Sequence, residues 1–351
     1  MSYRVLILGA SYGSLLGTKL AMAGHDVTLV CRTQTAQLIN GSGTEVRIKL
    51  RGEETHRAIC SADLPGTIDA ATPAEVDVTA YDMVGLAMQE PQYRSEEIRD
   101  LMRRIAKAGL PCLSIMNMPP LAYLRRLPGL DAEALRDAYT CPEIWDDFEP
   151  GLVTLCSPDP QAFRPPEEGA NVLHVGLPTN FKSAAFGAAQ HTEMLRKLEA
   201  DIAAVTLDDN DVPVKLRVYD SLFVPLAKWS MLLTGNYRCV MPGGVRPIRD
   251  AVHSSPETSQ AIYAHVDAIA RKLGADPADQ VPFEKYAKAA ESLLKPSSVA
   301  RAIDAGAEHV ERVDRLVNAI AKSLGMEMPE IAQTAATVDA RLLANQSEMA
   351  A

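Results

Sequence analysis

The chain has 351 residues, of which 47% are hydrophobic and 23% charged, as in an ordinary soluble globular protein. This length favours two domains, each with an ample core. The formal net charge is −10, from 35 basic and 45 acidic residues, which argues against nucleic acid or an anionic membrane as a partner. The first apolar run, residues 5–8, is too short for a signal peptide or a membrane span, so we expect a cytoplasmic protein.

The six cysteines and seven histidines are scattered along the chain. No cysteine pair has the C-x-x-C spacing of a zinc or redox site, and no histidine pair has the H-E-x-x-H spacing of a metalloprotease. We therefore expect no metal site, and cysteines that serve as small buried or half-buried apolar residues.

A strand–turn–helix–strand unit opens the chain. Residues 4–8 form a short continuous apolar run, which is typical of a parallel strand covered on both faces. A glycine-rich turn follows, and then a helical pattern that stops at Gly24. Residues 25–30 are again apolar and rich in β-branched side chains, so residues 4–30 predict one βαβ unit.

The same alternation continues along the chain. Residues 82–87 and 111–116 read as buried strands, and the charged, periodic stretch 95–107 between them reads as a helix. Short strands and turns are expected over residues 152–175. The pattern predicts a Rossmann-like, doubly wound parallel sheet.

The sequence changes character after about Asp208. An apolar stripe over residues 194–205 predicts a helix, and beyond Asp208 almost every segment has helical spacing, as over residues 310–324. We therefore expect an α/β nucleotide-binding domain over residues 1–208 and an all-helical domain over residues 209–351.

The glycine-rich turn is a candidate phosphate site. A turn between a buried strand and a helix exposes backbone N–H groups, and the helix dipole adds positive charge, so the turn can bind a pyrophosphate. The pattern departs from G-x-G-x-x-G, since it is one residue short and has serine at the second glycine. A tight turn without a ligand is the alternative. The predicted cofactor-binding residues here are Gly9, Ser11, Tyr12, Gly13 and Ser14.

The end of the second strand indicates which dinucleotide would bind. An NAD site usually has Asp or Glu there, which accepts a hydrogen bond from the ribose 2′-hydroxyl. Here Arg32 follows the strand and no carboxylate does. An arginine can bind a 2′-phosphate through two hydrogen bonds, so we expect NADP(H) rather than NAD(H). The alternative is a solvated arginine.

Six segments carry a resemblance to a known family: residues 13–17, residues 23–30 with Arg32, Asn117, residues 227–229, residues 295–298 and residues 325–329. They resemble the ketopantoate reductase (2-dehydropantoate 2-reductase) family, over nearly the whole chain and only in outline from about 125 to 215. The resemblance implies a Rossmann domain and a helical domain like that of 6-phosphogluconate dehydrogenase, with NADPH and a 2-oxo acid meeting in a cleft.

The resemblance also implies roles for residues of the helical domain. Lys228 matches a lysine that hydrogen-bonds the substrate's oxygens, and Asn236 matches an asparagine eight residues later. Such an ammonium would stabilise and protonate the oxygen that gains negative charge when hydride arrives. Leu232 stands where the family has a further asparagine, which indicates an altered pocket. The alternatives are a surface lysine beside Trp229 and an Asn236 that caps a helix after Gly235.

A family serine that holds the substrate carboxylate is matched by Ser297 or Ser298. No glutamate stands twelve residues after either serine, so His309, Glu308 or Glu311 is left to replace it. In the first domain Gln89 or Gln92 replaces a family lysine at a cofactor site. Asn117 is expected to contact cofactor or substrate.

The sequence as a whole predicts an NADPH-dependent reductase of a 2-oxo acid or related ketone, with ketopantoate itself disfavoured by Leu232. Two alternatives stay open: an imine or opine-type reductase, and a non-catalytic NADP-binding regulatory protein. A homodimer through the helical domain is implied by the family only.

Overall fold

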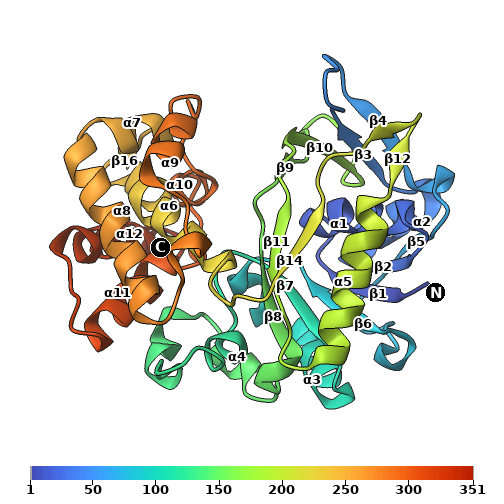
Figure 1. Cartoon of the computed structure of the whole chain (residues 1–351), viewed down its shortest axis with the longest axis horizontal. Coiled ribbons are helices and arrows are strands. Elements are labelled where there is room, and N and C mark those ends of the chain that lie inside the picture. The colour runs from blue at the N-terminus through green and yellow to red at the C-terminus, as the bar shows by residue number, and fades with distance from the viewer. Residues whose placement is uncertain (1, 351) are drawn as a thin grey trace. The chain divides into compact units, whose positions relative to one another are not determined.

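The computed structural model describes residues 2–350, and the chain divides into two compact units (Figure 1). The first, called here the sheet unit, contains the residues up to Met88 together with Gln92–Arg126 and Glu143–Asp220. The second, the helical unit, contains Gln89–Pro91, Leu127–Pro142 and the chain from Ser221 on.

An eight-stranded sheet forms the centre of the sheet unit, in the order β14-β11-β8-β7-β6-β1-β2-β5. Every neighbouring pair is parallel except β8 and β11. The strands are β1 (Arg4–Leu8), β2 (Asp26–Val30), β5 (Ile68–Ala71), β6 (Met83–Leu86), β7 (Cys112–Ile115), β8 (Val153–Ser157), β11 (Phe181–Ala184) and β14 (Leu216–Tyr219).

The predicted parallel sheet is confirmed, and burial explains its pattern. The four residues of β1 after Arg4 are fully buried, so both faces of this strand are covered and its sequence is continuously apolar. β2 and β7 lie on opposite sides of the β6–β1 pair. Right-handed crossovers therefore put α1 and α3 on opposite faces of the sheet. The helices are α1 (Tyr12–Met22), α2 (Thr33–Ser42), α3 (Glu96–Ala108), α4 (Leu121–Leu124) and α5 (Ala189–Ala203).

A smaller sheet of four strands, in the order β4-β3-β10-β9, completes the sheet unit. Its members β3 and β10 pair in parallel, while β4 and β9 pair antiparallel at the two edges. A short hairpin lies elsewhere in this unit. The strands are β3 (Glu45–Ile48), β4 (Arg57–Cys60), β9 (Gln161–Phe163) and β10 (Val172–Leu177), with the hairpin β12 (Thr206–Leu207) and β13 (Asn210–Asp211).

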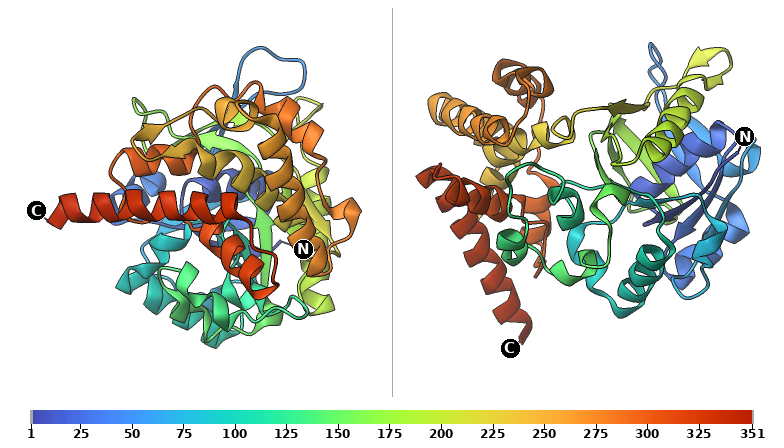
Figure 2. Two further views of the ribbon diagram at one scale, coloured as in Figure 1. Left: turned by 90° about the vertical axis from the view of Figure 1, so that its left-hand side faces the viewer. Right: turned by 60° about the horizontal axis from the view of Figure 1, so that its bottom comes forward.

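The C-terminal part of the chain is mostly helical, as expected, and α12 is the long red helix in Figure 2. β14 corrects the expectation of helix after Asp208, because Leu216 and Val218 alternate with exposed residues and add an edge strand to the large sheet. The elements are α6 (Lys228–Met231), α7 (Ile248–His253), α8 (Pro256–Lys272), α9 (Phe283–Ala290), α10 (Ser298–Asp304), α11 (Val313–Ser323), α12 (Pro329–Ala350), β15 (Val240–Met241) and β16 (Gly244–Val245).

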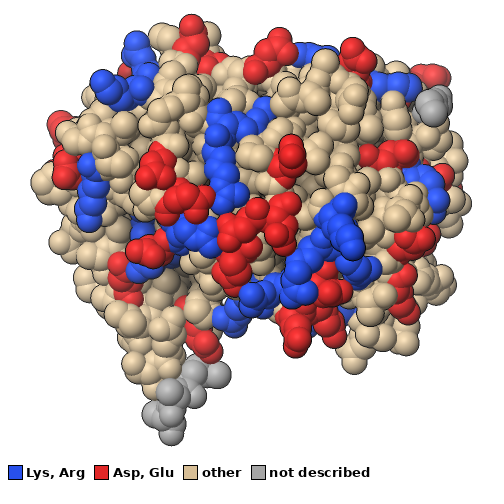
Figure 3. Space-filling model, turned by 90° about the horizontal axis from the view of Figure 1, so that it is seen from below, with Lys and Arg blue, Asp and Glu red and all other residues tan. Residues whose placement is uncertain are grey.

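Acidic and basic side chains are interspersed on the face shown in Figure 3. Within residues 2–350 no helix has both the length and the apolar character to cross a bilayer. Four of the six cysteines are buried and two are half-buried, which confirms the sequence-based expectation for them.

Candidate functional site

The glycine turn after β1 has a shape that requires glycine at position 9. Gly9 has φ +102°, and its N–H donates to the carbonyl of Val30 at 3.0 Å. A Cβ atom on Gly9 would lie 2.8 Å from the carbonyl oxygen of Ala87 and 2.8 Å from Cγ of Met88. The chain ends of β1, β2 and β6 are thus drawn tightly together at this turn.

The next glycines bring α1 close to the sheet. A Cβ on Gly13 would lie 2.7 Å from Cγ2 of Ile7, and one on Gly17 would lie 3.1 Å from Cγ1 of Val27. Ser14 is also buried, and its hydroxyl donates to the carbonyl of Ala10. Gly13 and Ser14 therefore face the interior of the sheet unit.

Ser11 and Tyr12 are half-buried at the start of α1. Ser11 is the N-cap residue, but its side chain makes no capping hydrogen bond, and the first turn of α1 contains no acidic residue. The first turn of α1 therefore supplies no carboxylate of its own to offset the positive end of the helix dipole. Together with the close approach at Gly9, it fits the pyrophosphate of a dinucleotide.

Two arginines lie near this turn. Arg32 follows β2, is exposed and forms the N-cap of α2. Arg164 follows β9 and donates from Nη2 to the carbonyl of Ala10 at 2.8 Å. Nothing in the sequence pointed to Arg164, because it is 154 positions away from the turn that it contacts.

Other predicted residues of the cofactor site are more scattered. Asn117 is half-buried just after β7, the strand next to β6. Gln89 and Gln92 are both exposed; Gln89 groups with the helical unit, and Gln92 with the sheet unit. Met88, the residue before Gln89, is the side chain next to Gly9.

In the helical unit, Lys228 begins a helix that runs without a break to Cys239. α6 passes at Leu232 into a π-helical turn, Leu232–Asn236, and then into a short 3₁₀ turn. Lys228 and Asn236 are half-buried, and Leu232 between them is 4% exposed. The alternative in which Asn236 caps a helix after Gly235 is wrong, because the helix continues past both residues.

The π-helical turn changes which residues share a face. In a regular α-helix, residues eight apart lie about 80° from each other around the axis, since each residue turns about 100°. Here the N–H of Tyr237 bonds to the carbonyl of Leu232, five residues back. A turn closed in this way contains more residues, so it brings Asn236 back towards the face of Lys228.

Tyr286 on α9 supplies a local reason for this turn. Its hydroxyl donates to the carbonyl of Met231 at 3.1 Å, in the helical turn where α6 gives way to the π-helical segment. A Cβ on Gly235 would lie 2.0 Å from that hydroxyl oxygen, so only glycine leaves room for it. A side-chain group inserted at a helix is a known cause of such irregular turns.

Ser297 fixes Asn236 from the other side. The Ser297 hydroxyl donates to the backbone carbonyl of Asn236 at 2.7 Å and accepts from the N–H of Ala300 at 3.2 Å, as the N-cap of α10. The single O–H donor of this hydroxyl is used within the protein, and the residue is 3% exposed. Ser298, the first residue of α10, is exposed.

One candidate for the family's glutamate, Glu311, is in contact with this helix through its backbone. The Tyr237 hydroxyl donates to the carbonyl of Glu311 and accepts from the N–H of Val313 at 3.0 Å. Burial raises the pKa of Tyr237 well above its ordinary value, so the hydroxyl keeps its proton. Glu311 is 7% exposed, whereas Glu308 and His309 are half-buried and precede α11.

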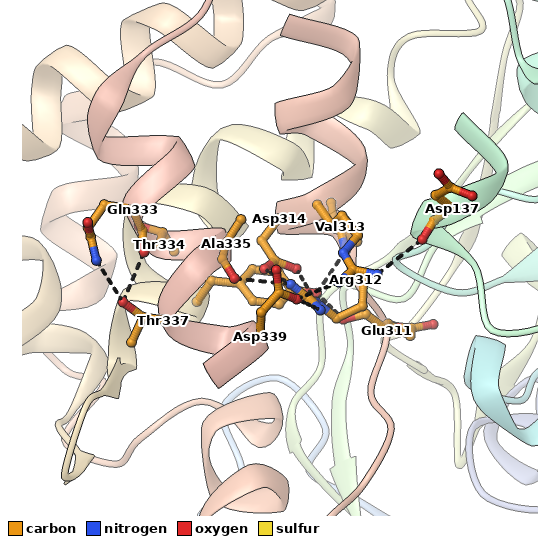
Figure 4. Close-up of polar contacts among 12 residues, drawn as sticks. Asp137, Glu311, Arg312, Val313, Asp314, Gln333, Thr334, Ala335, Thr337 and Asp339 are labelled. Atoms are coloured by element: carbon orange, nitrogen blue, oxygen red, sulfur yellow. Dashed lines mark hydrogen bonds and ion pairs between the residues drawn. The ribbon is translucent and has the colours of Figure 1, made fainter. Parts of the chain in front are cut away.

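A charged network holds the segment that follows Glu311 (Figure 4). Arg312 lies between two carboxylates: its Nη2 is 2.8 Å from Oδ2 of Asp314, and its Nη1 donates to Asp339 of α12. Arg315 also donates to Asp339, at 2.7 Å. Asp314 is fully buried and Arg312 nearly so, and a paired buried charge of this kind makes the local backbone strongly dependent on its partners.

The helical unit connects several of the segments that carry the predicted residues. Ser297 binds the backbone carbonyl of Asn236, and Tyr237, on the helix that begins with Lys228, binds the backbone carbonyl of Glu311. Within residues 2–350 we find no group of three or more His, Cys, Asp or Glu side chains that could hold a metal ion.

Comparison with known proteins agrees with this picture. Residues 5–94 match the family model described as ketopantoate reductase PanE/ApbA. No curated protein sequence matches the chain significantly.

Solved structures match over nearly the whole chain. A 2-dehydropantoate 2-reductase from Methylococcus capsulatus is 14% identical with a TM-score of 0.69, over 97% of each chain. A PanE/ApbA family ketopantoate reductase from Ralstonia eutropha JMP134 is 17% identical with a TM-score of 0.63, over 98% of this chain and 99% of that one. A D-mandelate dehydrogenase is 15% identical with a TM-score of 0.64, over 98% and 99%. The chain therefore has the fold of ketopantoate reductases, and its residues 5–94 resemble that family in sequence.

Proposed function

We propose that the protein is an NADPH-dependent reductase that transfers hydride to the carbonyl carbon of a 2-oxo acid or a related ketone. The observation that carries the proposal is the arrangement around the helix of Lys228. The π-helical turn and Ser297 hold the backbone of Asn236 on that helix, and Tyr237 holds the backbone of Glu311 against it. The family match of the sheet unit and its glycine turn support a nicotinamide dinucleotide as the partner in the reaction.

Hydride transfer to a carbonyl assigns roles to Lys228, Asn236 and Ser298. NADPH, when bound, supplies the hydride. As it reaches the carbonyl carbon, negative charge builds on the carbonyl oxygen, and the Lys228 ammonium stabilises that charge and donates the proton that completes the hydroxyl. The amide of Asn236 hydrogen-bonds the substrate and orients it. Ser298 is the better candidate for the substrate carboxylate, since the hydroxyl of Ser297 is used inside the protein.

The preference for NADPH over NADH rests on the end of β2. Arg32 is exposed there, where an NAD site would have a carboxylate. The replacement Arg32→Asp should weaken NADPH binding about 10- to 100-fold and leave NADH binding unchanged or improved, because a charge-assisted bond to the 2′-phosphate is lost. Titration of both cofactors checks this, and an equal loss for both would make Arg32 a structural residue.

The substrate is expected to carry an apolar group next to its carbonyl, since buried Leu232 lies between Lys228 and Asn236. The D-mandelate dehydrogenase noted above was solved with NADH and anilino(oxo)acetate, a 2-oxo acid with an aromatic group. That ligand is consistent with an apolar pocket on this fold, although its cofactor is NADH. Larger 2-oxo acids with aliphatic or aromatic side chains are therefore our first choice of substrates.

The test is cofactor oxidation by the purified protein with a panel of 2-oxo acids, simple ketones and cyclic imines, each with NADPH and with NADH. Turnover of a 2-oxo acid with NADPH is the expected result. Turnover of imines alone would favour an imine or opine-type reductase. Tight NADPH binding without turnover of any panel member would favour a non-catalytic regulatory protein. The homodimer and the cytoplasmic location stay predictions, of which light scattering tests the first.

A further inference from the structure

We propose that Arg164 is a second arginine for the 2′-phosphate of NADP(H), which it binds together with Arg32. The proposal rests on the proposed function for the identity of the ligand. It adds a specificity-determining residue from a strand outside the βαβ unit, in the small sheet of β3, β4, β9 and β10.

The first support is the position of Arg164. It directly follows β9, and its Nη2 donates to the carbonyl of Ala10 in the glycine turn at 2.8 Å. A second bond joins the same two segments, since the Tyr12 hydroxyl donates to the carbonyl of Pro160 at 2.8 Å. The residues around β9 are therefore fastened to the glycine turn at both ends of the strand.

The second support is the charge that collects there. Arg164 interacts electrostatically with Arg32 and with Cys31, the two residues after β2, and is itself half-buried. Within residues 2–350 neither guanidinium forms an ion pair with a carboxylate. Burial, with Arg32 acting in the same direction, lowers the pKa of Arg164. Two neighbouring cations without an acidic partner repel each other until an anion binds between them.

A purely structural role explains the contact with Ala10 less well. The carbonyl of Ala10 already accepts a hydrogen bond from the buried hydroxyl of Ser14, so the turn does not depend on Arg164 for its only partner. A short polar side chain could bind the turn at a lower entropic cost, since ordering an arginine side chain loses much conformational entropy. The bond to Ala10 uses one of five guanidinium N–H groups and leaves most of the fork available.

The position favours the 2′-phosphate over the pyrophosphate. In this fold the pyrophosphate binds at the N-terminus of the first helix, whereas the adenosine ribose lies at the end of the second strand. Arg164 contacts the carbonyl of Ala10, and the preceding residue, Gly9, bonds through its N–H to Val30 at that strand end. A phosphate monoester carries nearly two negative charges at neutral pH, which matches a pair of guanidinium groups.

The experiment measures binding, separately from catalysis. Calorimetry gives the Kd of NADPH, NADH and 2′,5′-ADP for the wild type, Arg164→Gln and Arg164→Lys. We expect Arg164→Gln to weaken NADPH and 2′,5′-ADP about 10- to 100-fold, with NADH changed less than about threefold. Arg164→Lys, which keeps the charge without the planar fork, should recover part of this loss.

Arg126→Gln is the matched control. Arg126 is also half-buried in the sheet unit, its pKa is also lowered by burial, and it donates to the carbonyls of Val153 and Ala185 at 2.9 and 2.8 Å. This variant should leave the ratio of the NADPH and NADH dissociation constants unchanged. Thermal unfolding of all variants separates a loss of fold from a loss of binding.

Equal weakening of NADPH and NADH in folded Arg164→Gln would overturn the inference, as would no weakening at all. A wild-type protein that ignores 2′,5′-ADP and prefers NADH would also overturn it, while a reductase function could still stand. A wild type that binds 2′,5′-ADP and NADPH, loses both in Arg164→Gln and reduces no substrate would refute the proposed function and support the role of Arg164.

Discussion

Leu232 is the residue at which the chain departs most clearly from the chemistry implied by its family resemblance. It is buried, with Lys228 before it and Asn236 after it along the same helix. Each methylene of a substrate buried against it contributes about 0.8 kcal/mol. A polar substrate group placed there without a partner costs about 1–3 kcal/mol. Leu232 should therefore select for apolar substrates.

We predict that Leu232→Asn lowers kcat/KM for an apolar 2-oxo acid and raises it for ketopantoate, because the amide offers a partner to the ketopantoate hydroxyl. The measurement is competition between the two substrates, with the wild type and with the variant. A wild type that reduces ketopantoate best would show that the leucine has no influence on specificity.

Lys228 is the residue on which the proposed chemistry depends most. We predict that Lys228→Ala reduces kcat by roughly 10²–10⁴ with little change in NADPH affinity, because the charge is needed mainly in the transition state. Lys272, exposed at the end of α8, provides the control, since Lys272→Ala removes a charge from the same unit. Equal turnover in both variants would remove Lys228 from the mechanism.

Among the elements, the π-helical turn Leu232–Asn236 has the largest effect on where the proposed site residues lie around their helix. It turns Asn236 towards the face of Lys228, and it occurs where Tyr286 reaches Met231. Irregular helical turns of this kind are frequently found at functional sites, where the shifted side chains are used. Here the turn connects the packing of α9 with the geometry of the proposed site.

We predict that Gly235→Ala lowers both stability and kcat, because its Cβ would lie 2.0 Å from the Tyr286 hydroxyl oxygen and must displace it. The loss of stability should be about 1–3 kcal/mol. Gly243→Ala is the control, since a Cβ there meets no atom within 4 Å. Thermal unfolding and steady-state kinetics measure the two effects.

Adding Tyr286→Phe to Gly235→Ala removes the clashing oxygen, so the double variant should regain stability. If Asn236 then lacks its usual position, kcat stays low while stability recovers. Full recovery of kcat together with stability would show that the π-helical turn is a packing feature without a role in the reaction.

The sequence predicted the elements whose cause is local. The βαβ unit of β1, α1 and β2 was predictable because burial on both faces and the glycine turn are written into adjacent residues. The π-helical turn was not, since Tyr286 stands 55 positions after the carbonyl that it contacts. Arg164 was missed for the same reason, because its partner Ala10 is brought to it only by the packing of β9 against the turn.

At the scale of the whole molecule, each unit buries a basic side chain, but the two side chains differ in how well an acidic partner balances their charge. In the helical unit Arg312 is paired with Asp314 and Asp339, so its charge is retained. In the sheet unit Lys19 of α1 is 1% exposed, and its Nζ donates to the carbonyl of Val212 at 3.3 Å. Its charged neighbours are Lys215, which opposes its protonation, and the mostly exposed Asp211, which favours it more weakly.

Lys19 should make the stability of the protein depend on pH. Burial, followed by the charge of Lys215, lowers the pKa of Lys19 from 10.5 to about 7. Between these values the unfolded chain binds a proton at this site that the folded chain does not, so the free energy of unfolding rises with pH over this window. Below about pH 7 both states are protonated, and the full cost of the buried charge remains.

We therefore predict that urea unfolding of the wild type, followed by circular dichroism, shows increasing stability from pH 7 to pH 10. Lys19→Met, which keeps the buried volume without the charge, should flatten this rise and stabilise the protein at pH 7 by on the order of 2 kcal/mol. The exposed Lys107 of α3 serves as the control, since Lys107→Met should leave the pH dependence unchanged. If Lys19→Met keeps the full slope, the proton is taken up elsewhere, and α1 tolerates a charged lysine in the protein interior.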